Sequence, residues 1–115
     1  MACLNIATNI SLDGVDLSVI LSEVTSSVAE IIGKPKAYVM IVMKGSVPIA
    51  FGGTELPAAY GELTSVGGLG CHENRQLSAA ISSILETKLS IPKPRFFLKF
   101  SDSKASSLGW NGSTL

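Results

Sequence analysis

The chain is built from two similar halves, and this repetition constrains the fold more than any other feature of the sequence. In the first half, an apolar strand over residues 3–9 leads through a turn into an amphipathic helix that ends at Ile32. Gly33 is placed as the helix C-cap, and Pro35 prevents the helix from continuing. The apolar run over residues 38–43 then predicts a strand buried on both faces. The first half therefore reads as one strand–helix–strand unit.

The second half repeats this plan. Residues 58–66 form a strand candidate with weak alternation, and residues 67–70 form a glycine-rich loop. Residues 73–89 carry apolar side chains at helical spacing, and residues 95–100 form the closing strand. Two β-α-β units in sequence predict an α+β fold with a four-stranded sheet and two helices on one face of it. The other face of the sheet then requires a partner.

The composition supports a partner of the same kind. The chain has 115 residues, close to the commonest domain size, so we expect residues 1–115 to form a single domain. Hydrophobic residues make up 46% of the chain and charged residues only 16%, which is more apolar surface than one small core needs. Burial against other copies of the chain is the simplest consequence, and we expect an oligomer.

Charge and cysteine content narrow the function classes. The formal net charge is zero, so no nucleic-acid partner is expected. No apolar run reaches the length of a membrane span, and the first ten residues lack the pattern of a signal peptide, which favours the cytoplasm. Cys3 and Cys71 are far apart in the sequence, so neither a redox motif nor a metal site is expected. Residues 113–115 are similar to the small-basic-Leu peroxisomal signal but lack its basic residue, so the peroxisome is only a minor alternative, and secretion without a signal peptide also stays open.

Ala2 is a candidate for chemistry because it lies at the start of the first strand. A small residue at position 2 generally permits removal of Met1, and the α-amine would then lie on Ala2. An α-amine has an ordinary pKa of about 7.7–8.0, so it can serve as a general base at neutral pH. The alternative is that Ala2 only begins a strand.

Three later segments give Ala2 more weight: Gly33-Lys34-Pro35, Ser65-Val66-Gly67-Gly68-Leu69-Gly70 and Gly109-Trp110-Asn111-Gly112-Ser113-Thr114. Together they make the chain similar to the macrophage migration inhibitory factor/D-dopachrome tautomerase family, particularly its plant members. The resemblance covers essentially the whole chain. It implies the tautomerase fold, a homotrimer with sites between subunits, and keto–enol tautomerisation of phenylpyruvate-like or dopachrome-like substrates without a metal or organic cofactor.

The resemblance also implies roles for individual residues. Ala2 occupies the base position, where the family has proline. Lys34 corresponds to the lysine that binds the carboxylate of an aromatic keto acid, and the backbone amide of Val66 borders that carboxylate. The remaining site residues form an aromatic wall or come from the neighbouring subunit: Tyr38, Leu108 and Trp110, and Phe97 and Lys99, respectively. Lys34 also has a simpler interpretation, because a lysine at a helix C-terminus complements the helix dipole.

The replacement of proline by Ala2 leaves several alternatives open. A primary amine has more rotational freedom than the ring nitrogen of proline, so the tautomerase activity is expected to be impaired. Acetylation of the amine would remove the base altogether, and an engineered replacement of the proline is a third alternative. The second function class is a cytokine-like or intracellular protein-binding trimer without significant catalysis, whose partner is a receptor or another protein.

Overall fold

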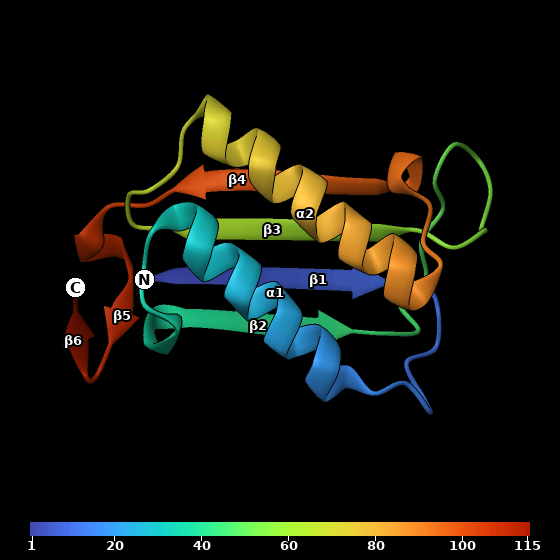
Figure 1. The fold of residues 1–115 in the computed structure, drawn as a ribbon, viewed down its shortest axis with the longest axis horizontal. Helices are drawn as coiled ribbons and strands as arrows, with labels where there is room; N and C mark the ends of the chain where they lie inside the picture. The colour runs from blue at the N-terminus through green and yellow to red at the C-terminus, as the bar shows by residue number, and fades with distance from the viewer.

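The structure is a computed structural model that describes residues 1–115, and it contains a four-stranded sheet with two helices on one face (Figure 1). The first half of the chain forms β1 (Ala2–Thr8), α1 (Leu17–Ile32) and β2 (Val39–Lys44). The second half forms β3 (Ala59–Ser65), α2 (Cys71–Leu89) and β4 (Phe96–Asp102). Three short 3₁₀ helices lie at Lys36–Tyr38, Lys93–Arg95 and Ala105–Ser107, and two further strands follow, β5 (Gly109–Trp110) and β6 (Ser113–Thr114).

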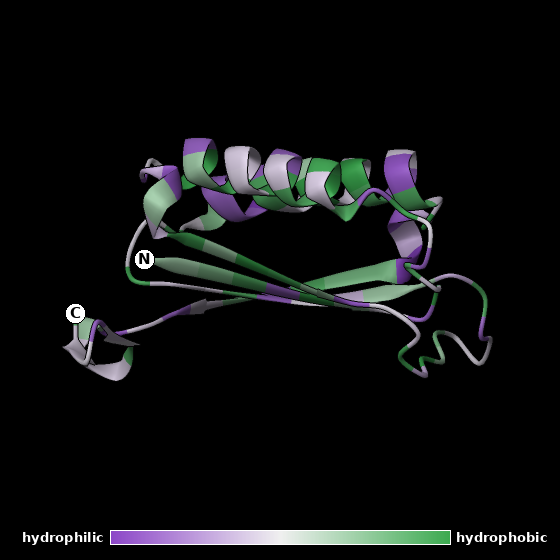
Figure 2. Cartoon of the chain, turned by 90° about the horizontal axis from the view of Figure 1, so that it is seen from below, coloured by the Kyte–Doolittle hydropathy of each residue, from purple (hydrophilic) through white to green (hydrophobic).

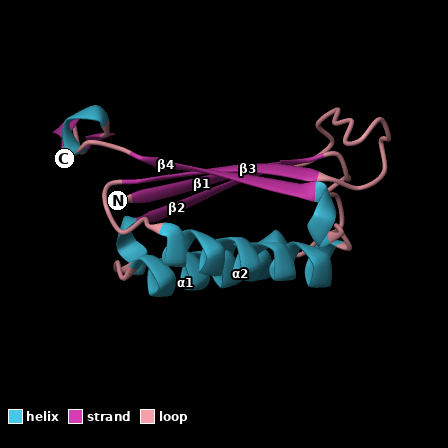
Figure 3. Cartoon of the chain, turned by 90° about the horizontal axis from the view of Figure 1, so that it is seen from above, coloured by secondary structure: helices cyan, strands magenta, loops and turns pink.

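The strand order β2-β1-β3-β4 follows from the repeated halves. Each half pairs its own two strands in parallel, and the two halves meet through the antiparallel pair β1 and β3 at the centre of the sheet. The first pair in each half joins residues 37 positions apart: Ala2 with Val39, and Ala59 with Phe96. The predicted sheet with two helices on one face is confirmed. One face of the sheet is therefore covered and the other is open (Figures 2 and 3).

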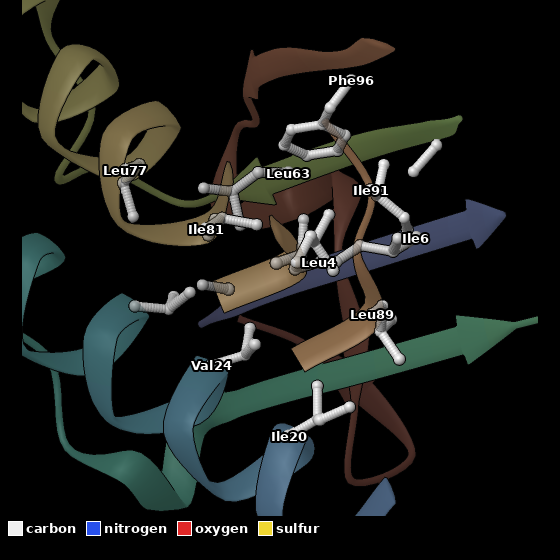
Figure 4. Packing of buried hydrophobic residues seen from close by; sticks show 14 of the residues in the cluster. Leu4, Ile6, Ile20, Val24, Leu63, Leu77, Ile81, Leu89, Ile91 and Phe96 are labelled. Atoms are coloured by element: carbon white, nitrogen blue, oxygen red, sulfur yellow. The ribbon is translucent and has the colours of Figure 1, made fainter. Parts of the chain in front are cut away.

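The core lies between the covered face of the sheet and the two helices. Alternate residues of β1 and β3 point into it, as the period of a strand requires, and residues at helical spacing on α1 and α2 meet them. The fully buried members include Leu4 and Ile6 of β1, Leu63 of β3, Val24 of α1, and Leu77 and Ile81 of α2 (Figure 4). This core fixes the two strands at whose ends the site residues lie.

The C-terminus of α1 is as predicted. Gly33 adopts the left-handed conformation at φ 75°, and its backbone N–H donates to the carbonyl of Ala29. The next residue, Lys34, donates its backbone N–H to the same carbonyl at 2.9 Å. This cap turns the chain sharply and directs the segment after α1 toward the start of β1.

The prediction that residues 38–43 form a strand buried on both faces is wrong for this chain. β2 is an edge strand, and most of the face of the sheet opposite the helices is left uncovered. Met40 is consequently 62% exposed and Phe97 of β4 is 63% exposed. We call this surface the open face; across the four strands it consists of Met40, Val42, Lys44, Cys3, Asn5, Ala7, Tyr60, Glu62, Thr64, Phe97, Lys99 and Ser101.

Boundaries differ from the expected ones by one or two residues. α2 begins at Cys71 rather than at residue 73, because the chain is already helical where the glycine-rich loop ends. The β5–β6 hairpin was not predicted; its turn is formed by Asn111 and Gly112, both at positive φ. The hairpin and the loop after β2 extend beyond opposite ends of the sheet, on the side away from the helices (Figure 3). Neither α1 nor α2 is long and apolar enough to cross a membrane.

Candidate functional site

A pocket lies where β1 begins, beside the start of β2 and the C-terminal hairpin. Its volume is about 300 Å³, and it is lined by residues 1–3, 37–40 and 108–110. All but one of these residues are hydrophobic. Figure 1 shows why they meet: the N-terminus of β1 and the β5–β6 hairpin lie at the same end of the molecule. A mostly apolar concave surface of this kind suits an organic ring.

Four of the predicted site residues line this pocket. They are Ala2, Tyr38, Leu108 and Trp110. The rings of Tyr38 and Trp110 meet edge to face, with centroids 6.4 Å apart and planes at 85°. Trp110 is 53% exposed, so it forms one lip of the pocket and is not part of the core. The hairpin is therefore held against the body of the fold in part by an aromatic contact at the pocket itself.

Lys34 lies next to this pocket and reaches toward Met1. Its ammonium group donates to the carbonyl of Val66 and, at 3.5 Å, to the carbonyl of Met1. An ammonium group has three N–H donors, so these two contacts leave one for a further acceptor. The structure thus brings Lys34 and Val66, two predicted site residues, into direct contact.

The carbonyl of Met1 has a second donor. The backbone N–H of Val66 donates to it at 3.0 Å, so the Val66 amide and the Lys34 ammonium converge on a single oxygen. That oxygen lies two covalent bonds from the nitrogen of Ala2. Converging backbone and ammonium donors form the kind of arrangement that also binds an anionic oxygen. The sequence did not predict the part played by Met1, because it depends on how closely three separate segments approach.

The surroundings of the N-terminus favour a neutral α-amine on Met1. The pKa of the Met1 α-amine is lowered from its ordinary value of 8.0, first by burial and then by the hydrogen bond and the positive charge of Lys34. Burial also raises the pKa of the Cys3 thiol, whose side chain lines the same pocket. Both shifts disfavour charge, in agreement with the apolar lining.

Phe97 and Lys99 are not brought to this pocket within one chain. Both lie on the open face, on β4, paired with Tyr60 and Glu62 of β3. Phe97 packs edge to face on Phe51, with ring centroids 5.1 Å apart. Their contribution to the site of a neighbouring subunit stays a prediction. No group of three or more His, Cys, Asp or Glu side chains is placed to hold a metal ion.

Cys3 and Met40 are two of the pocket residues that were not predicted from the sequence. They face each other in the parallel register of β1 and β2, and both point to the open face. The sequence pattern was sufficient to predict them, because two adjacent parallel strands must start at the same end of the sheet. Alternation of side chains along each strand then selects every second residue.

Comparison with known proteins gives a consistent picture. The family described as "Macrophage migration inhibitory factor (MIF)" matches residues 1–115. A macrophage migration inhibitory factor homolog of Trichuris trichiura is 36% identical over 114 residues, covering 99% of each chain. The solved structure of a homologue from Prochlorococcus marinus superimposes with a TM-score of 0.93 at 35% identity, covering 97% of each chain. That of the factor from Trichinella spiralis gives a TM-score of 0.91 at 37% identity, covering 98% of this chain and 99% of the other.

Proposed function

The chain belongs to the macrophage migration inhibitory factor family, and we propose that it interconverts the keto and enol forms of small aromatic keto acids of the phenylpyruvate or dopachrome type. The reaction takes place in the pocket at the start of β1, with the α-amine of Ala2 as the base. Ala2 stands where the family has proline, so the activity is reduced. The proposal includes a homotrimer, a cytoplasmic location and the plant-type subfamily.

The observation that carries this proposal is the pair of donors on the Met1 carbonyl. Removal of Met1 takes this acceptor away and leaves the Val66 N–H and the Lys34 ammonium free for another oxygen. It also converts the nitrogen of Ala2 into an amine at the same place. A keto acid bound through its carboxylate would therefore have its reacting carbon beside the base, with its ring toward Tyr38 and Trp110.

The chemistry needs only a base and a stabilising cation. The neutral amine takes a proton from the carbon next to the ketone, and the C–H electron pair becomes the C=C bond as the carbonyl pair moves to oxygen. The proton then passes from the ammonium to that oxygen, which completes the enol. Lys34 stabilises the carboxylate and the developing negative charge in an apolar pocket, where such an interaction is stronger than in water.

The first experiment follows the enol absorbance of a phenylpyruvate-type acid after intact mass analysis of the N-terminus. We expect Ala2→Pro to raise kcat/KM by about tenfold or more, because the ring fixes the nitrogen in position. Lys34→Met should lower kcat/KM by about tenfold or more. The matched control is Lys93→Met, which removes the same charge from an exposed lysine at the opposite end of the sheet and should change the rate by less than about twofold.

One outcome would overturn the proposal. If this chain and Ala2→Pro are both inactive although their N-termini are free, the pocket is not a tautomerase site. The second function class, a protein-binding trimer of the cytokine-like or intracellular kind, then becomes the leading account. A different result would be an inactive protein whose Ala2 is acetylated, together with an Ala2→Pro variant that is unblocked and active. The missing base would then explain the loss of activity.

A further inference from the structure

We propose that Asp102 is a positioning residue for Lys34 and acts through the peptide group that joins Val66 to Gly67. Its catalytic consequence rests on the proposed function, because Lys34 is the expected carboxylate ligand. Asp102 does not line the pocket and does not touch the Met1 carbonyl. Its effect on a bound acid therefore has to pass through other groups.

The connection is a single peptide group. The carboxylate of Asp102 accepts the backbone N–H of Gly67 at 3.2 Å, and the ammonium of Lys34 donates to the carbonyl of Val66. This N–H and this carbonyl belong to the same planar unit, so neither can turn without the other. An acidic group on the N–H and a basic group on the carbonyl polarise the unit in the same sense, and each hydrogen bond strengthens the other.

The turn that contains this peptide group is held by packing against the end of α1 and by a side-chain hydrogen bond within the turn. Gly68 is at φ 77°, and a Cβ atom there would lie 2.4 Å from Cγ2 of Ile32, so the turn packs directly on the end of α1. The hydroxyl of Ser65 donates to the carbonyl of Gly67 at 2.5 Å. Two residues after Ile32 the chain reaches Lys34, so the orientation of the turn decides where the Lys34 ammonium finds its acceptor.

The side chain of Asp102 is not needed for the fold itself. The sheet register that pairs Asp102 with Ser65 is made by backbone groups, and the side chain is exposed. Loss of its carboxylate removes one anchor of the Val66–Gly67 peptide and leaves the strand in place. The expected result is a mobile peptide, a less fixed Lys34 and weaker binding of a carboxylate. The aromatic wall should be unaffected.

The test compares an aromatic keto acid with its methyl ester. Asp102→Ala should raise KM for the acid by about three- to tenfold and should leave KM for the ester, which has no carboxylate, within about twofold. Asp102→Asn keeps an acceptor for the Gly67 N–H and should recover most of the loss.

In a Lys34→Met background, Asp102→Ala should have no further effect, because the two residues act in one chain of contacts. The control Asp13→Ala removes an exposed carboxylate that makes no side-chain hydrogen bond or ion pair.

Two readouts do not depend on turnover. Quenching of Trp110, the only tryptophan, measures binding of the acid even if no tautomerisation occurs. Crystal structures of Asp102→Ala and Asp102→Asn should show the Lys34 ammonium displaced from the Val66 carbonyl in the first and retained in the second. If Lys34 stays on that carbonyl in Asp102→Ala, or if the Asp102 and Lys34 effects add independently, the inference is wrong whatever the outcome for the proposed function.

Discussion

Lys34 is the residue on which most of the site chemistry depends. Its ammonium contacts two backbone carbonyls that come from different parts of the chain, at Met1 and at Val66. Burial is the largest cause of the lowered pKa of the Met1 α-amine, and the hydrogen bond and the positive charge of Lys34 are the next two. One side chain thus helps to hold an acceptor site and to keep a neighbouring amine neutral.

A pH profile tests this at the level of single residues. If the Ala2 amine is the base, it acts only when neutral, so kcat/KM should rise with pH and then level off. This amine would lie in the same apolar pocket beside Lys34, where burial and like charge lower an amine pKa, so the midpoint should lie below the ordinary range of an α-amine. Lys34→Met removes the positive charge beside the Ala2 amine and leaves its burial, so the midpoint should move to higher pH. The measurement uses the methyl ester of the keto acid, which has no carboxylate for Lys34 to bind.

Two results would contradict this account. An activity that falls as the pH rises through this range would mean that the amine acts in its charged form. A midpoint that is the same in Lys34→Met would mean that the lysine does not influence the base. The Lys93→Met variant provides the control for a general effect of lost positive charge.

At the level of elements, one guanidinium bonds to most of the loop over residues 51–57. Arg95 donates to four backbone carbonyls of this loop, those of Phe51, Thr54, Leu56 and Pro57, at 2.8–3.3 Å. It also lies 5.2 Å from the centroid of the Phe51 ring. A planar guanidinium with five donors can meet four carbonyls at once, which is more than the three N–H donors of an ammonium allow.

Arg95→Lys should therefore loosen this loop without changing the sheet. We expect a loss of about 1–2 kcal/mol in the free energy of unfolding, since charged hydrogen bonds to partly exposed carbonyls are lost. Hydrogen exchange at the amides of Phe51 and Thr54, which bond to each other's carbonyls, should become faster. Arg75→Lys, at an exposed position of α2, is the matched control. Unchanged exchange in the loop would show that the Asn9 side chain, which also contacts it, is sufficient.

Much of this arrangement could be predicted from the sequence. The apolar spacing over residues 17–32 and the Gly33 cap gave α1, and the repeated pattern gave the sheet with its two helices. The hairpin at Asn111 was missed although Asn-Gly is a strong turn signal, because strands of two residues have no periodicity to read. The contacts of Arg95 and Asp102 were missed because they join residues whose approach is set by packing of distant segments.

At the level of the whole molecule, the open face is the main surface that the fold leaves without a covering layer. It carries exposed Met40, Tyr60 and Phe97, which are residue types enriched where proteins bind one another. Tyr60 donates to the Glu62 carboxylate at 2.8 Å, and this bond, with burial and the charge of Glu62, raises the pKa of its hydroxyl. Family membership supports an oligomer.

Sedimentation measurements should give about three times the chain mass of 12.0 kDa if the homotrimer forms. Met40→Asp, which places a charge on the open face at the edge strand β2, should shift the population to the monomer. Gln76→Asp adds the same charge to an exposed position of α2 and should leave the mass unchanged. A monomer in the unmodified protein would show that the homotrimer proposal is wrong.

The strand order also has a consequence for how the chain folds. Each half pairs its own strands at a separation of 37 residues, whereas the central pair joins Ala2 to Ser65 across a longer stretch of chain. Loop-closure entropy favours the shorter pairings, so the two halves should form before the sheet closes at its centre. Until the sheet closes, β1 of one chain can pair with β3 of another chain just as it pairs with β3 of its own chain. The seam between β1 and β3 is thus the place where concentrated refolding would exchange halves between molecules.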